Sequence, residues 1–179
     1  MQKKKIFIEI ALPGQVKRKL LQKVERWQNL PVKWMKEDSM HVAVAFVGYV
    51  DESVVPEICA KVSEAVAVLE SFDMEIDTIG LGPDANDPKM IWATGKPNQQ
   101  LKALNEAVEK SLGMFIESHK QFSPHITLGR IRKLKWESLQ EKPAISEAYK
   151  FFVPVDSVVV MESKGGGEEY VMLEECSLA

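Results

Sequence analysis

The hydrophobic pattern of the chain switches between two periods, one typical of β-strands and the other of amphipathic helices. Short apolar stretches that end near Pro or Gly predict strands at 6–10, 40–47, 72–79, 89–94 and 123–131. Apolar residues spaced three or four apart predict helices at 15–28, 52–71 and 99–115. Two further stretches, 155–162 and 170–174, flank Lys164-Gly165-Gly166-Gly167 and predict a hairpin with a flexible tip. We therefore expect an α+β fold.

An internal repeat organises this pattern. A shift of 84 residues places the strand–helix–strand unit at about 5–48 onto a second unit at about 89–132. The residues that coincide include Pro13 with Pro97, Leu20 with Leu104, Ser39 with Ser123, and His41 with His125. We predict a single domain over residues 1–179, with two pseudo-symmetric lobes of antiparallel sheet, outer helices and a cleft between the lobes.

Each repeat begins its last strand with a histidine. Because side chains alternate between the two faces of a strand, every second residue shares a face. The residues expected in the core are Val42, Val44 and Phe46 in the first strand, and Ile126 and Leu128 in the second. Those expected on the opposite face are His41, Ala43 and Ala45, and then His125 and Thr127. About a pseudo-two-fold axis, both histidines can converge on one groove.

A histidine beside apolar residues on a strand is usually structural, so either motif alone is weak. The pair at one repeat offset favours function, whereas His119 falls on Met35 and is interpreted as a surface or loop residue. Two histidines suit phosphodiester chemistry because a pKa of ~6.5 lets one be neutral and the other protonated. The neutral ring takes a proton from water and the charged ring protonates the leaving oxygen. No Asp, Glu or Cys spacing joins them, so we expect no metal and no cofactor.

Composition limits the partners. The chain has 179 residues, 45% hydrophobic and 27% charged, with a net charge of −3, which excludes a broadly basic nucleic-acid coat. RNA would need a local basic patch. Between Glu117 and Glu137 there is no acidic residue, while the basic ones are Lys120, Arg130, Arg132, Lys133 and Lys135, to which Lys17, Arg18 and Lys19 are possible additions. This stretch is either a phosphate-binding patch beside His125 or a solvated charged face.

The chain shows no targeting or membrane signal. The apolar run after the basic N-terminus is too short for a secretory signal, and no stretch approaches the ~20 apolar residues of a membrane span. Cys59 and Cys176 lie far apart, without redox or metal spacing. We therefore expect a reduced cytoplasmic protein and a monomer.

The sequence resembles the two-histidine phosphoesterase superfamily, whose signature is a pair of H-x-T/S-x motifs. Within it, the chain is similar to the bacterial and archaeal RNA 2′,3′-cyclic phosphodiesterases, also called 2′-5′ RNA ligases. The similarity runs through almost the whole chain. Besides the histidines it includes Leu12-Pro13, Trp34, Phe46-Val47-Gly48, Ile91-Trp92-Ala93, the segment from Phe122 to Arg130, and the C-terminal hairpin through Tyr170.

This resemblance implies that water opens a 2′,3′-cyclic phosphate at an RNA 3′ end to a 2′-phosphomonoester, without metal or ATP, and that reversal gives 2′-5′ ligation. It assigns the general acid to His41, the general base to His125 and a phosphate hydrogen bond to Thr127. Ala43 departs from the pattern because it stands where the family has Thr or Ser. Losing a hydrogen bond to a charged phosphate costs about 1.5–3 kcal/mol if nothing replaces it.

Two features stay open at this point. Arg130 matches a basic position of the family, yet strict alternation puts it on the core face unless a bulge re-aims it toward phosphate. Trp34, Trp92 and Phe122 either stack a terminal base or simply pack.

Three functions remain. The first is an enzyme acting on cyclic phosphate ends of RNA or small nucleotides, the second a degenerate nucleotide or RNA-end binding module, and the third a phosphodiesterase for another small cyclic nucleotide. Retention of both histidines favours an enzyme.

Overall fold

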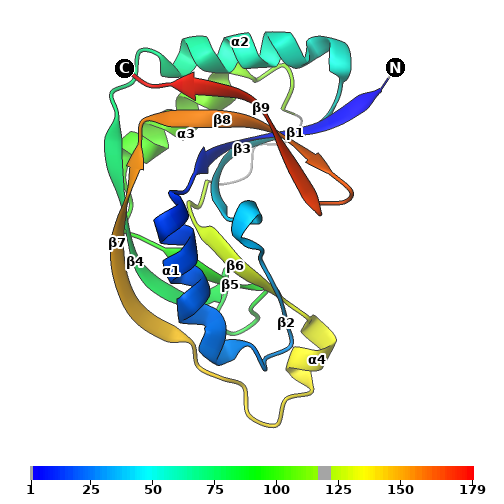
Figure 1. Cartoon of the computed structure of the whole chain (residues 1–179), viewed down its shortest axis with the longest axis vertical. Coiled ribbons are helices and arrows are strands. Elements are labelled where there is room, and N and C mark those ends of the chain that lie inside the picture. The colour runs from blue at the N-terminus through cyan, green and yellow to red at the C-terminus, as the bar shows by residue number, and fades with distance from the viewer. Residues whose placement is uncertain (1, 117–121) are drawn as a thin grey trace.

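The computed structural model describes residues 2–116 and 122–179. In these residues nine strands form one sheet, in the order β7-β4-β5-β6-β3-β1-β8-β9, with β2 paired to β6 (Figure 1). The strands are β1 (Lys3–Ala11), β2 (Val32–Trp34), β3 (His41–Asp51), β4 (Phe72–Gly82), β5 (Met90–Thr94), β6 (Ile126–Ile131), β7 (Ser146–Val155), β8 (Ser157–Lys164) and β9 (Glu169–Ser177). The helices are α1 (Gly14–Val24), α2 (Val55–Val66), α3 (Gln99–Ser111) and α4 (Lys133–Glu137).

The sheet has two four-stranded halves that meet at a seam between β3 and β6. One half runs β3-β1-β8-β9 and the other β6-β5-β4-β7, and the strand pairs are antiparallel. At the seam the register pair is Val42 with Ile126, two residues that are 84 apart in the sequence. The seam therefore joins equivalent positions of the repeat.

Each repeat sends its helix across to the other half of the sheet. Lys23 of α1 lies 3.4 Å from Glu147 of β7, and the Asn105 side chain of α3 donates a hydrogen bond of 2.8 Å to the Val44 carbonyl of β3. The apolar faces of these helices, including Leu20 and Leu104, join one core with Ile6, Ile8 and Ile10 of β1. Helices thus bury one face of the central strands, and the other face is left for a site.

The predicted elements are present, although their ends shift. The strand predicted from residue 123 begins at Ile126, and the helix predicted at 99–115 ends at Ser111. The predicted hairpin is β8–β9, whose tip glycines Gly165, Gly166 and Gly167 all have positive φ. β2, β7 and α4 were not predicted. β7 contains Pro154, which is tolerated because β7 lies at the edge of the sheet.

Two β-bulges lie at equivalent places in the two halves. Against β1, the register of β3 skips Val44, so that Ile8 pairs with Ala45 and Glu9 with Ala43. Against β5, the register of β6 skips Leu128, so that Ile91 pairs with Gly129 and Trp92 with Thr127. Val44 and Leu128 are again 84 residues apart. The repeat therefore extends to the irregularities of its strands.

These bulges overturn the simple alternation of side chains beyond them, because one extra residue moves the following side chains to the other face. The prediction that Phe46 lies in the core and Ala45 beside the histidine is wrong: Ala45 is buried, whereas Phe46 is 65% exposed. The same effect carries Arg130 away from the core face, where strict alternation placed it.

No helix among the described residues is both long and apolar enough to cross a membrane.

Candidate active site

A cleft of about 640 Å³ lies over the seam and takes side chains from both halves of the sheet. This volume is in the range of small-molecule sites. All four residues predicted for the site line it, namely His41, His125, Thr127 and Arg130. The expectation that both histidines converge on one groove is confirmed.

The two histidines are held in the same way. Nδ1 of His41 lies 2.9 Å from the Ser39 carbonyl oxygen, and Nδ1 of His125 lies 2.7 Å from the Ser123 carbonyl oxygen. A carbonyl oxygen only accepts, so each Nδ1 carries the hydrogen and Nε2 is the nitrogen left to exchange protons. Ser39 and Ser123, like the histidines, are related by the repeat.

Burial controls the charge of both rings. Burial lowers the pKa of His41 to about 4, against the Ser39 hydrogen bond, and the charges of His125 and Arg130 lower it further. Burial likewise lowers the pKa of His125, as does Arg130. Both rings therefore favour the neutral form in the empty cleft. A bound phosphodiester anion acts in the opposite direction because it stabilises an imidazolium beside it.

The surroundings of the two histidines differ. Glu9 pairs with Ala43 in one half, and Trp92 pairs with Thr127 in the other, so these two residues occupy equivalent positions. The Trp92 ring centroid is 5.0 Å from that of His125. Glu9 places Oε2 3.3 Å from Nδ1 of His41. Glu9 was not predicted for the site, although it is the one charged residue within the apolar strand predicted at 6–10.

The hydroxyl and guanidinium that face phosphate both come from β6. Thr127 Oγ1 donates to the sulfur of Met90 at 3.7 Å, a weak acceptor that a phosphate oxygen would replace readily. Arg130 is exposed and lines the same cleft. On β3 the corresponding positions hold Ala43 and Phe46, which supply neither a donor nor a charge. Lys5 and Lys36 also line the cleft and add positive charge, whereas Lys33 is paired with Glu168 of the same cleft at 3.2 Å.

An aromatic wall covers the His41 side of the cleft. Phe46 stacks with Phe7 at 6.4 Å between ring centroids, and Tyr170 of the C-terminal hairpin lies 5.5 Å from Phe7 and 5.9 Å from His41. Of the three residues considered for base stacking, Trp34 lines the cleft, while Trp92 packs on His125 and Phe122 packs against the core. Phe46 was missed because its bulge was not foreseen.

A small residue lets Trp34 lie close against β6. A Cβ at Gly129 would lie 2.4 Å from Val32 Cγ1 and 3.0 Å from Trp34 Cε3. Glycine at this position of β6 therefore allows β2 to lie close beside it.

Little of the predicted basic stretch reaches the cleft. His119 and Lys120 lie outside the described residues. Of the other four basic residues, Arg130 lines the cleft and Lys133 forms a 4.0 Å ion pair with Glu137 elsewhere. Arg18 of α1 is paired with Glu37 at 3.7 Å. Most of these charges therefore belong to a solvated face.

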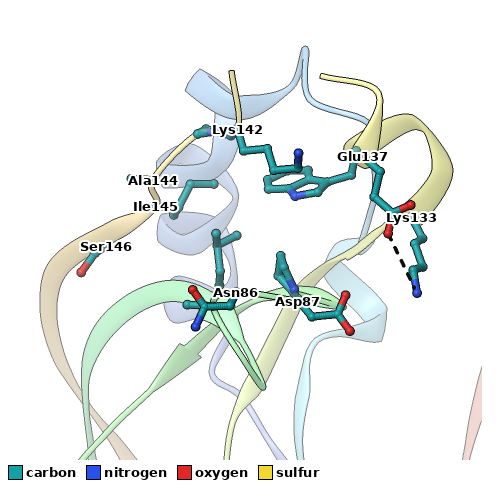
Figure 2. A pocket seen from close by; sticks show the side chains of 13 residues that line it. Asn86, Asp87, Lys133, Glu137, Lys142, Ala144, Ile145 and Ser146 are labelled. Carbon is teal, nitrogen blue, oxygen red and sulfur yellow. Dashed lines mark ion pairs between the residues drawn. The ribbon is translucent and has the colours of Figure 1, made fainter. Parts of the chain in front are cut away.

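A second cavity, of about 390 Å³, lies beside α4. Figure 2 shows Asn86 and Asp87 on one side of it, with Ile145 opposite and the Lys133–Glu137 ion pair at its edge. It contains none of the four predicted site residues. Across residues 2–116 and 122–179, no three His, Cys, Asp or Glu side chains gather as a metal-binding group.

Comparisons with known proteins give consistent matches over most of the chain. The family model described as the 2′-5′ RNA ligase superfamily matches residues 16–167. A protein named RNA 2′,3′-cyclic phosphodiesterase from Thermotoga maritima is 28% identical over 178 residues, which cover 95% of this chain and 93% of that protein. One of the same name from Aeropyrum pernix is 30% identical over 108 residues, 58% of this chain and 60% of its own length.

Solved structures show the same fold. E. coli LigT in complex with 3′-AMP aligns with a TM-score of 0.80 at 18% identity, covering 99% of both chains. A Thermus thermophilus protein aligns with a TM-score of 0.76 at 23% identity, covering 97% of both. The structural neighbours share the α+β architecture, and the family match extends over most of the sequence, so this chain belongs to the 2′-5′ RNA ligase superfamily.

Proposed function

We propose that this protein is a metal-independent RNA 2′,3′-cyclic phosphodiesterase, which opens a terminal cyclic phosphate to a 2′-phosphomonoester. The observation that carries the proposal is the matched pair of histidines. His41 and His125 come from equivalent positions, share one tautomer and line one cleft with Thr127 and Arg130. The relatives named RNA 2′,3′-cyclic phosphodiesterase support the choice of substrate.

The reaction needs one proton acceptor and one proton donor. Nε2 of neutral His125 takes a proton from water as the water oxygen attacks phosphorus. The bond between phosphorus and the 3′ oxygen breaks, and that oxygen takes a proton from Nε2 of the His41 imidazolium. Transfer of this kind is typically worth ~10²–10⁴ in rate for each group. Exchange with solvent then returns the proton from His125 to His41. When the 5′ hydroxyl of a second RNA end attacks phosphorus in place of water, the same proton transfers form a 2′-5′ phosphodiester bond and release the 3′ hydroxyl.

Thr127 and Arg130 hold the phosphate from the β6 side. The Thr127 hydroxyl donates to one non-bridging oxygen, and the guanidinium pairs with the anion. Arg130 has a second effect, because its charge lowers the pKa of His125 and keeps that ring neutral as the base.

The RNA end enters where Lys5 and Lys36 face its backbone and Phe46 offers a surface for a base. Small nucleotides with a cyclic phosphate fit the same cleft. We propose that the protein acts in the cytoplasm as a monomer.

One assay tests this function. The protein is incubated in EDTA with an oligonucleotide that ends in a 2′,3′-cyclic phosphate, and ³¹P NMR identifies the monoester formed. We expect the 2′-phosphomonoester, with at least a hundredfold loss in both His41→Ala and His125→Ala. His119→Ala is the matched control and should keep full activity. A lack of product, or a rate unchanged in the two variants, would overturn the proposal.

Ala43 favours one alternative, a binding module that holds a nucleotide end without turnover. In that case calorimetry with a nucleoside 2′-monophosphate would show binding, while the cyclic substrate stayed intact over the same concentration range.

A further inference from the structure

The carboxylate of Glu9 lies behind the proposed general acid. On β1, Ile6, Ile8 and Ile10 point into the core, so Phe7 and Glu9 share the opposite face, on which the cleft lies. Glu9 is only 8% exposed. A buried charged group is costly unless something compensates it. The buried carboxyl of Glu9 therefore calls for a partner.

That partner is His41. Glu9 Oε2 lies 3.3 Å from Nδ1, the nitrogen that also donates to the Ser39 carbonyl at 2.9 Å. Nδ1 thus has two oxygens beside it, the Ser39 carbonyl to which it donates and a Glu9 carboxylate oxygen at ion-pair distance, which can carry a full negative charge. A carboxylate at Nδ1 fixes the tautomer and the ring orientation, and it stabilises an imidazolium when Nε2 is protonated.

The other histidine has no such carboxylate at the equivalent place. Trp92 occupies the position in the second half that Glu9 occupies in the first, and its ring packs on His125 at 5.0 Å between centroids. An indole adds burial and no negative charge. The two halves of the repeat therefore favour different protonation states for their histidines.

We infer that Glu9 is the positioning residue that makes His41, rather than His125, the proton donor of the reaction. Its carboxylate lies at ion-pair distance from Nδ1 of His41, stabilises the imidazolium and opposes the loss of the Nε2 proton until the leaving oxygen takes it. The inference rests on the proposed function for the reaction it serves, but the contact itself is tested without turnover.

Burial and the neighbouring cations set the protonation balance that this role has to overcome. Burial raises the pKa of the Glu9 carboxyl to about 7, against the charge of Lys17 on α1, and burial lowers the pKa of His41 to about 4. His125 and Arg130 face His41 from β6 and also oppose its protonation. With these pKa values, near pH 6 the proton of the pair lies on Glu9 and the His41 ring is neutral until an anion binds. A bound anion favours transfer of that proton to the imidazole, which leaves Glu9 ionised. A phosphate anion at Nε2 and an ionised Glu9 at Nδ1 both act to keep that charge on the imidazole.

The direct test is a ¹⁵N NMR titration of the histidine rings between pH 4 and 9, with saturating inorganic phosphate as the probe. We expect His41 to titrate at least about one pH unit lower in Glu9→Gln than in the wild type, as for loss of an opposite charge within ~4–6 Å. His125 should change by much less. Glu9→Asp, which keeps the charge on a shorter side chain, should recover part of the difference.

An unchanged His41 titration in Glu9→Gln, or an equal change in His125, would overturn the inference. Circular dichroism of each variant shows whether it is folded. If Glu9→Gln is unfolded, Glu9→Asp becomes the test. A His41 tautomer and titration identical to those of the wild type in Glu9→Asp would then contradict the proposal.

Activity against pH gives the second readout. With the cyclic phosphate substrate, kcat/KM of Glu9→Gln should begin to fall at a lower pH on the alkaline side, so that it loses about tenfold more at pH 8 than at pH 6. Glu162→Gln is the matched control, because Glu162 is also a buried carboxyl on a neighbouring strand but pairs with Lys4 at 3.1 Å. Its profile should keep the wild-type shape.

The two arms separate the two proposals. A wild-type protein that hydrolyses no cyclic phosphate, yet shows the His41 difference by NMR, would refute the proposed function and leave the Glu9 contact established. If the protein is active but Glu9→Gln changes neither the His41 titration nor the pH profile, the inference alone is refuted.

Discussion

Phe46 and Arg130 occupy the same position in the two halves of the protein, five residues after a histidine and just beyond a bulge. Both line the cleft. The repeat has therefore kept the place and changed the chemistry, with an apolar ring beside His41 and a cation beside His125. In the proposed function, a substrate therefore meets the two sides with different groups, its phosphate toward β6 and an apolar face toward β3.

Arg130→Ala should lower kcat/KM for the cyclic phosphate by about 10- to 100-fold, because a hydrogen bond to a charged group is worth ~1.5–3 kcal/mol. Arg132→Ala is the matched control, since Arg132 is exposed and lies outside the cleft. Steady-state kinetics at several salt concentrations checks this. Equal losses in the two variants would mean that only the general positive charge matters.

Phe46→Ala should raise KM for a nucleoside 2′,3′-cyclic phosphate with little change in kcat, because stacking on a base is worth ~1–3 kcal/mol and does not touch the reacting atoms. The comparison substrate is a cyclic phosphate of a simple diol without a base, for which KM should not change. Phe152→Ala removes another exposed ring, on β7, and should have no effect. A fall in kcat for both substrates would instead give Phe46 a role in the chemistry.

Ala43→Thr restores a hydroxyl facing the phosphate and should raise kcat/KM by about tenfold. Ala43→Val has a similar shape without the hydroxyl and should bring no gain. The two variants are compared by initial rates on one substrate. An equal rate in wild type and Ala43→Thr would show that another donor already fills this place.

In the pH profile of kcat/KM, the midpoint of the fall on the acidic side should lie below pH 6.5. A base works only when it is neutral, and burial together with Arg130 lowers the pKa of His125, which extends the neutral form to lower pH. Removing the cation in Arg130→Ala should move the acidic limb of kcat/KM to higher pH. The measurement covers pH 4–7, with Arg132→Ala expected to follow the wild type. A limb that moved to lower pH would contradict the sign of this coupling.

Glu9→Gln should stabilise the folded protein at alkaline pH. Burial raises the pKa of Glu9 to about 7 from 4.5, so the folded wild type holds a proton that the unfolded chain has lost, and it loses stability as pH rises through this window. The variant lacks this loss. The free energy of unfolding of Glu9→Gln should exceed that of the wild type by nearly zero at pH 4 and by at most about 3 kcal/mol at pH 8. Urea unfolding at the two pH values measures it; an advantage independent of pH would point to packing instead.

The pairing of His41 with His125 was predictable because one offset in the chain relates them, and a shared offset means a shared place in a repeated unit. Thr127 followed from the alternation of side chains, since no bulge lies between it and His125. The overall α+β architecture was also predictable, because the periodicities of strands and helices depend only on which residues are buried locally.

The bulges were not predictable in this way. Val44 and Leu128 are ordinary core residues, and an unpaired position in a ladder leaves no mark on composition. Consequently Phe46 was placed on the wrong face and Arg130 remained undecided. The contact between Glu9 and His41 depends on the register of two strands 32 residues apart in sequence, which periodicity does not reveal. β7 was missed because its edge position lets polar residues and Pro154 into a strand.

At the seam, Val42 and Ile126 are register partners, and each directly follows a histidine. The two proposed catalytic groups, from distant parts of the chain, are thereby linked through a single pair of backbone partners. Their mutual effective concentration is set by the folded sheet, so no translational or rotational freedom of either ring has to be lost when the substrate arrives. A substitution that loosened this one pair, such as Val42→Pro, would turn an intramolecular acid–base pair into two independent imidazoles.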